Sequence, residues 1–174
     1  EVIKILEEDH FLKKSFDSIH IEAFDLYLER LDPNKNIFLS SELTKFKEDI
    51  ANQKDIKDNL RVAYEAFKIY GERYQNRYDL QIDFLNSISE QDLRSSRKII
   101  RDRSKAERLD SIIELENSWT DLILNDVIQL MLSGNSVEES AEKTQKRLKN
   151  QLNYFNQTRN VDIFNIYINS ISSI

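Results

Sequence analysis

A single proline interrupts a chain whose apolar residues otherwise follow the period of helices. Pro33 is the only proline among 174 residues, and the chain contains only two glycines. Because proline and glycine supply most tight turns, so few of them leave little material for an architecture with many strands. The sequence therefore predicts an all-α fold, an irregular domain of about six or seven helices.

The segment around Pro33 is predicted to be a buried turn between two helices. Pro33 fixes its own φ and biases the preceding residue away from the helical region. Ile37, Phe38 and Leu39 then form a short apolar run that we expect to be extended and buried. Ser40 or Ser41 is expected to cap the helix that follows.

Apolar residues spaced by three and four positions locate the helices. The predicted helices cover residues 2–13, 18–31, a segment from Leu43 to Ile50, 55–88, 108–132, a segment that follows Ser136, and a last one capped by Asn160. The longest, near 55–88, would be roughly 50 Å long. Gly71 near its middle is expected to permit a close helix crossing or to mark a bend. Gly134 is expected to end the 108–132 helix, and the Ser136-x-x-Glu139 pattern has the form of a capping box.

We expect residues 1–174 to form a single helical domain. Apolar residues in helical register stand at both ends of the sequence, Val2 and Ile3 at one and Ile171 and Ile174 at the other. Such faces would have to pack on something, so we interpret the chain as a fragment of a longer protein.

Residues 89–107 break the apolar pattern and are predicted to be a long basic connection. Between positions 94 and 108, seven basic residues stand against two acidic ones. Five of them are candidates for a protein contact: Arg94, Arg97, Lys98, Arg101 and Arg103. We favour a solvated loop that balances the acidic remainder over this contact, and nucleic acid or lipid head groups are further alternatives. The net charge of −6 argues against a general nucleic-acid binder.

The sequence offers little catalytic chemistry. It has no cysteine, no glycine-rich phosphate loop, and neither the G-x-S-x-G nor the H-E-x-x-H pattern. We therefore expect no catalytic residue, no cofactor and no metal. Glu7-x-x-His10 has the spacing of a di-iron ligand pair, and Asp17-x-x-His20 loosely repeats it, but boundary histidines are the alternative. Tyr64, Tyr70, Tyr74 and Tyr78 of the long helix could stack on bases, but we favour core packing with the hydroxyls at its rim.

Three segments in order resemble the N-terminal helical domain of tail-specific (carboxyl-terminal processing) serine proteases. The first runs from Phe24 through the Leu31-Asp32-Pro33 turn to Leu43. The second joins Asp102-Arg103-Ser104-Lys105-Ala106 to the helix that carries Trp119. The third extends from Gln145 through the last two helices to Tyr167.

The resemblance implies a non-catalytic domain of a periplasmic or periplasm-facing protease that degrades proteins from their C-termini. PDZ and protease domains of the parent, with a Ser–Lys dyad, would lie outside this chain. The domain would shape the substrate enclosure, or it would contact an adaptor protein or protein substrates with accessible C-terminal tails. We expect no nucleic-acid partner. A freestanding helical adaptor that binds a partner protein is the alternative.

Overall fold

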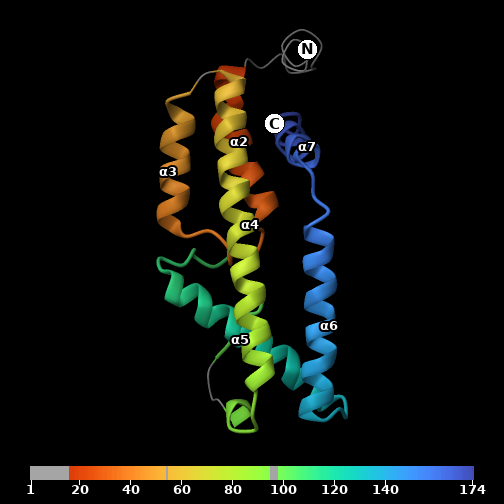
Figure 1. Ribbon diagram of the computed structural model, residues 1–174. Helices are drawn as coiled ribbons and strands as arrows, with labels where there is room; N and C mark the ends of the chain where they lie inside the picture. The colour runs from red at the N-terminus through yellow and green to blue at the C-terminus, as the bar shows by residue number, and fades with distance from the viewer. Residues whose placement is uncertain (1–15, 54, 95–97) are drawn as a thin grey trace. The chain divides into compact units, whose positions relative to one another are not determined.

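The computed structural model describes residues 16–174 except for positions 54 and 95–97 (Figure 1). The helices are α2 (Phe16–Leu31), α3 (Ser40–Ala51), α4 (Ile56–Ser87), the 3₁₀ helix η1 (Asp92–Arg94), α5 (Ile112–Leu132), α6 (Val137–Phe155) and α7 (Asn160–Ile171). No strand occurs in these described residues, which confirms the predicted all-α class. The helix predicted over 2–13, with Glu7 and His10, lies outside them.

The described residues form two compact units. Unit 1 contains the chain up to Pro33, Phe38–Tyr70 and Arg159–Ile174, and unit 2 contains Asn34–Ile37 and Gly71–Thr158. The long helix α4 belongs to both, with its first half in unit 1 and its second half in unit 2. The prediction of one domain over 1–174 stays a prediction.

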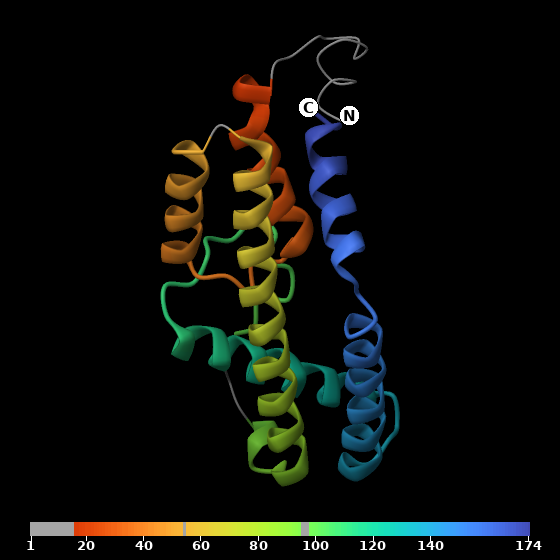
Figure 2. The same ribbon diagram turned by 45° about the horizontal axis from the view of Figure 1, so that its top comes forward.

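Unit 1 has an aromatic core between α2, α3, the first half of α4, and α7. Helix α2 packs against α3 and α7 (Figures 1 and 2). Tyr27 and Tyr167 are fully buried, and their rings meet edge to face with centroids 5.6 Å apart. The Tyr27 hydroxyl donates to the carbonyl oxygen of Ala63 at 2.9 Å, so this buried hydroxyl is satisfied. Burial is the main cause that raises the pKa of both tyrosines above the ordinary value.

The apolar end of the proline turn is buried as predicted, although it bends rather than extends, whereas Pro33 and Asn34 are exposed. Phe38 is fully buried and Ile37 is nearly so, while Leu39 is half-buried. The Phe38 ring lies edge-on to Phe46 with centroids 6.0 Å apart. The turn also places Lys35 at φ 51°, the left-handed region that disfavours a residue with a Cβ.

Helix starts were predicted with mixed success because capping can use a carboxylate as well as a hydroxyl. The Ser136 box is confirmed, since its Oγ accepts from the Glu139 N–H at 3.1 Å. The expected caps Ser40, Ser41 and Asn160 are wrong. The capping positions are Leu39 and Arg159, whose backbone N–H groups donate to the side chains of Glu42 and Asp162 at 2.8 Å each.

Unit 2 is built on α5, α6 and the second half of α4, with α5 packed against α6 and η1. Its smaller apolar core consists of Leu85, Ile123, Val127, Ala141 and Leu148. Helix α5 begins at Ile112 rather than at 108, because Ser111 and Glu114 form a capping box there. Gly134 has a φ of 97° and ends α5 as predicted.

Gly71 is a point of close approach within unit 2. A Cβ at this position would lie 3.4 Å from the Phe155 ring. The neighbouring Tyr74 stacks on the same ring with centroids 4.6 Å apart. Of the two expectations for Gly71, close approach has structural support.

Candidate functional site

The predicted basic contact residues do not share one environment. Arg94 in η1 is exposed and pairs with Glu90 at 4.0 Å across an exposed turn, while Arg101 and Lys98 are exposed on the irregular segment that follows. Arg103 is buried, with only 8% of its surface accessible. Arg97 lies outside the described residues. The structure therefore brings Lys98 and Arg103 to a common cavity and leaves Arg94 apart from it.

The segment from Lys98 to Asp110 is irregular but ordered by its own hydrogen bonds. The Ser104 N–H donates to the Asp102 carboxylate at 2.9 Å, and the Ala106 N–H donates to the Arg103 carbonyl oxygen at 2.9 Å. Hydrogen bonds from the Ser104 side chain and backbone lower the pKa of the Asp102 carboxyl. These local bonds fix a turn that carries Arg103 inward.

Arg103 has a side-chain N–H donor that finds no acceptor among the described residues. Its Nη2 donates to the carbonyl oxygen of Glu107 at 2.8 Å. Its Nε–H is buried and finds no acceptor among the residues that the structure describes. Because an unpaired buried donor costs free energy, such a group needs a physical reason.

A cavity of about 260 Å³ lies at this segment. The residues that line it are Lys98, Ile99, Ile100, Arg103, Leu109, Glu114, Asn117, Ser118 and Asp121. They supply apolar, cationic and hydrogen-bonding surface to one small space. A cavity of this size is slightly below the range of drug-sized ligand pockets. It can therefore hold a group of about the size of one residue.

Helix α5 supplies the polar wall of the cavity through residues spaced by three and four positions. Glu114, Asn117, Ser118 and Asp121 follow one face, beside the buried stripe of Leu115, Trp119 and Ile123. This polar stripe was not singled out from the sequence. Its signal was the regular 114–117–118–121 spacing within an otherwise apolar helix.

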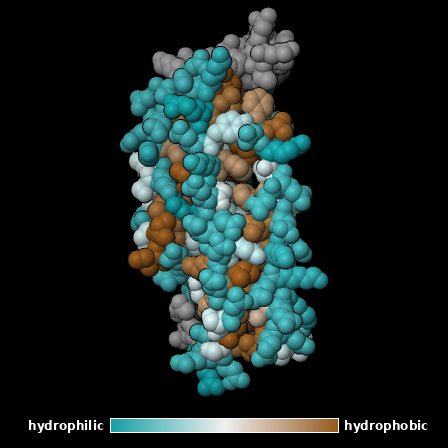
Figure 3. Space-filling model, in the orientation of Figure 1, coloured by the Kyte–Doolittle hydropathy of each residue, from teal (hydrophilic) through white to brown (hydrophobic). Residues whose placement is uncertain are grey.

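Large apolar side chains are exposed next to the cavity-lining residues. Ile113 is 70% accessible and Ile100 is 58% accessible, and Ile112 at the start of α5 is also exposed. Figure 3 shows apolar surface at the edge of the molecule over the first turns of α5. Ile100 belongs both to this surface and to the cavity. Exposed apolar groups grouped in this way are typical of interaction sites.

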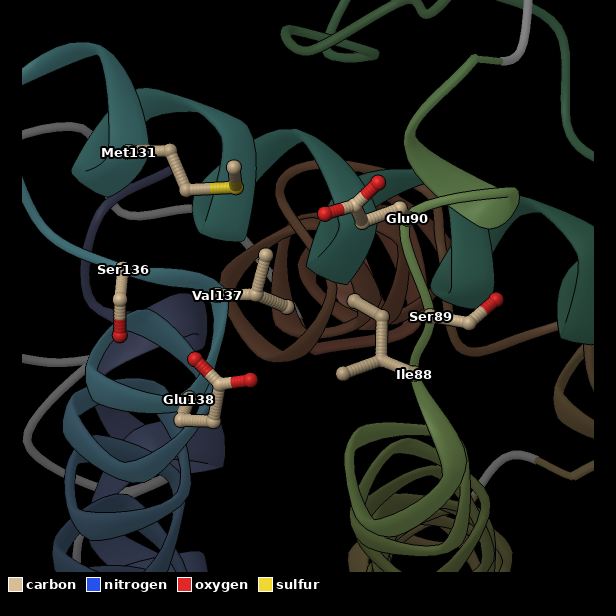
Figure 4. Close-up of a pocket in the computed structure, with 7 residues that line it drawn as sticks. All are labelled: Ile88, Ser89, Glu90, Met131, Ser136, Val137 and Glu138. Atoms are coloured by element: carbon tan, nitrogen blue, oxygen red, sulfur yellow. The ribbon is translucent and has the colours of Figure 1, made fainter.

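A second cavity, of about 330 Å³, lies between the end of α4 and the start of α6 (Figure 4). Its apolar lining comes from Ile88, Met131 and Val137, and its two carboxylates belong to Glu90 and Glu138. Hydrogen bonds from its own backbone N–H and from Ser136 lower the pKa of Glu138. Among the polar residues of this cavity, Ser136 belongs to the α6 capping box, Glu90 pairs with Arg94, and Ser89 donates to Asp92.

The metal hypothesis gains no support from the described part of the chain. His20 is buried in unit 1, with its ring 5.7 Å from that of Phe16. In the described residues, no three side chains of the metal-binding types cluster together.

Each helix that the structure describes is too short or too polar to cross a membrane.

Fold and site define an all-helical domain with an apolar and cationic surface on one connection. A comparison with protein families assigns it further. The family model described as the tail specific protease N-terminal domain matches residues 2–174, and the chain belongs to that family. The resemblance seen in the sequence is thereby confirmed.

A curated relative supports the same assignment. The "Tail-specific protease" of Haemophilus influenzae is 28% identical over 171 residues. That alignment covers 96% of this chain but 24% of the relative, so the chain spans about a quarter of the length of that relative.

Proposed function

We propose that this chain is the non-catalytic N-terminal domain of a periplasmic tail-specific serine protease. The observation that carries the proposal is the family match over residues 2–174, together with the relative of which the chain covers a quarter. The parent protein would degrade protein substrates from the C-terminus. Its PDZ and protease domains, with the catalytic Ser–Lys dyad, would lie outside this chain.

The role proposed for the helical domain is to contact protein, as part of the substrate enclosure or as a surface for a substrate or adaptor. Support comes from unit 2, where Ile100, Ile112 and Ile113 are exposed beside a cavity that contains Lys98 and Arg103. Apolar surface flanked by cationic groups is suited to a protein chain that offers apolar and acidic groups. The unit 1 core, by contrast, encloses its aromatic residues, and the large apolar side chains that the described part of unit 1 exposes are Ile21 and Val161.

Two measurements test this proposal. The coding sequence that follows Ile174 should continue into PDZ and serine protease patterns. The purified 174-residue chain should cleave no protein substrate. The full-length parent should degrade a protein substrate, and a serine-directed inhibitor should block this degradation. A coding sequence that ends soon after Ile174 would favour the freestanding adaptor, and peptidase activity of the isolated chain would contradict the non-catalytic role.

A further inference from the structure

The cavity at residues 98–121 combines three kinds of surface that rarely meet in so small a space. Ile99, Ile100 and Leu109 supply apolar walls, and Lys98 and Arg103 supply positive charge. The α5 side contributes hydrogen-bonding groups from Asn117, Ser118 and Asp121. A ligand that complements this cavity must carry an apolar group, an anion and backbone-like polar groups within about the volume of one residue.

Arg103 indicates that the anion is a carboxylate-like acceptor. The guanidinium is buried, it donates only one hydrogen bond among the described residues, and its Nε–H lacks an acceptor. Guanidinium groups bind carboxylates through paired N–H donors, and these charge-assisted bonds are stronger than neutral ones. A bound carboxylate would supply acceptors that the described residues do not provide to Arg103.

We propose that this cavity binds the last residue of a polypeptide, with the terminal carboxylate on Lys98 and Arg103 and an apolar side chain against Ile99, Ile100 and Leu109. The inference rests on the proposed function, because it gives the helical domain its own contact with substrate tails. Such a contact would be separate from any site in the domains that lie outside this chain.

A chain end fits the cavity better than an internal acidic residue does. Only at the C-terminus do a carboxylate and an apolar side chain branch from the same Cα, so one residue satisfies both surfaces. An internal aspartate or glutamate would bring its charge without an apolar group at the same residue. The backbone N–H of the last residue would find acceptors on Asn117 and Ser118 of α5.

Of the two acidic residues of the cavity, Glu114 is compatible with an anionic ligand because its charge is already engaged. The Glu114 Oε2 accepts from Asp110 N, Ser111 N and Ser111 Oγ at 3.0 Å each. Its charge also sits in the first turn of α5, where the helix dipole favours a negative group. Asp121 also has a partner within the structure, but its buried Oδ1 accepts no hydrogen bond from the described residues.

Fluorescence anisotropy with labelled ten-residue peptides tests the inference on the 174-residue chain. One peptide ends in leucine as the free acid, and the second is the same peptide as its C-terminal amide. A third is amidated after a final glutamate and carries its carboxylate on a side chain. The free acid should bind at least about tenfold more tightly than either amidated peptide. This comparison changes no residue of the protein, so it does not depend on the folding of any variant.

Matched variants locate the site. Lys98→Gln and Arg103→Gln should weaken binding of the free acid about tenfold, to the level of the amide. Arg94→Gln removes the same charge from an exposed position outside the cavity and should leave binding unchanged. Ile100→Ser should weaken binding, whereas Leu132→Ser, which alters an exposed leucine at the other end of α5 and outside the cavity lining, should not.

Equal affinity for the acid and the amide, or no binding at about 1 mM peptide, would overturn the inference. So would an Arg94→Gln effect as large as that of Lys98→Gln, which would indicate diffuse charge attraction. Failure of the inference leaves the family-based proposal standing. A parent sequence without protease patterns would instead defeat the proposed function even if tails bound here.

Discussion

Two irregular connections of this protein have opposite characters. The proline turn between α2 and α3 buries Asp32, Ile37 and Phe38, and polar groups of the turn are bonded inside the protein. The Phe38 N–H donates to the buried Asp32 carboxylate at 3.1 Å, and the Asn36 carbonyl oxygen accepts from the Trp119 indole N–H at 2.7 Å. The segment from Lys98 to Asp110 instead exposes Ile100 and contains a buried guanidinium N–H that has no acceptor among the described residues.

The difference separates a connection that holds the fold from one that is available for binding. A loop whose backbone and side-chain groups are satisfied internally has nothing left to offer a ligand. Exposed apolar side chains and unpaired donors raise the free energy of a loop, and a partner that covers them lowers it. Substitutions in the turn should therefore change stability, and substitutions in the basic connection should change binding.

The largest effect is expected for Phe38→Ala in the turn. Removing this fully buried ring should cost about 3–5 kcal/mol of unfolding free energy, as other large core truncations do. At roughly 2–4 °C per kcal/mol for a chain of this size, the melting temperature should fall by about 10 °C. Circular dichroism at 222 nm, followed as the temperature rises, measures the melting temperature. A melting temperature within a degree or two of the wild type would show that Phe38 is not part of the core.

Trp119→Phe should have the next largest effect. It keeps an aromatic ring on α5 but deletes the N–H that donates to Asn36, and Trp119 is nearly fully buried. The lost hydrogen bond and the smaller ring should together cost about 2–3 kcal/mol. Urea unfolding followed by helical signal would detect the change. An unaltered midpoint would mean that the turn does not need this anchor.

Asp32→Ala should cost about 1–3 kcal/mol, because it removes the acceptor of the buried Phe38 N–H. The same urea experiment applies, with Asp110→Ala on the basic connection as the exposed control. Equal losses in the two variants would contradict the contrast between the connections.

Ile113→Ser should change stability by less than about 0.5 kcal/mol, since the side chain is 70% accessible. Thermal unfolding checks this value beside Phe38→Ala. A loss of several kcal/mol would place Ile113 in a packed environment and remove part of the apolar surface that supports the proposed contact.

The smallest effect is a titration shift on the basic connection. The Ser104 side chain, followed by its backbone N–H, lowers the pKa of the exposed Asp102 carboxyl. Because the folded-state pKa lies below the unfolded value, the stabilisation exists above the unfolded pKa and disappears as pH falls through the folded one. Ser104→Ala should raise the Asp102 pKa toward its ordinary value in a carboxyl-carbon NMR titration. No change would mean that the Ser104 side chain does not hold this turn.

Helices were predictable because their signals are local. The spacing of apolar residues located α2 to α7 within a few positions, and the Ser136 box fixed the start of α6. The start of α5 was missed although Ser111-Ile112-Ile113-Glu114 has the same pattern, because Leu109 continued the apolar period upstream. The apolar period and the capping pattern can indicate different helix starts, and the apolar period alone does not decide between them.

The candidate site was predictable only in part because it depends on contacts between distant positions. Charge density marked the 94–108 segment, but it could not distinguish exposed Arg94 from buried Arg103. The polar residues that complete the cavity belong to helix α5 and not to the basic segment, and only folding brings them close to Lys98. Similarly, the Trp119 contact with Asn36 joins positions 83 residues apart, and no local pattern encodes it.

Substrate degradation by the full-length parent tests the central claim most directly, which is that this domain contacts protein substrates while catalysis resides elsewhere. The measurement is kcat and KM for a protein substrate with an apolar C-terminus, compared between the parent and its Lys98→Gln/Ile100→Ser variant. The account predicts a KM raised at least about fivefold with kcat unchanged, because substrate binding alone is weakened. A kcat that falls while KM stays constant, or unchanged values of both, would contradict it.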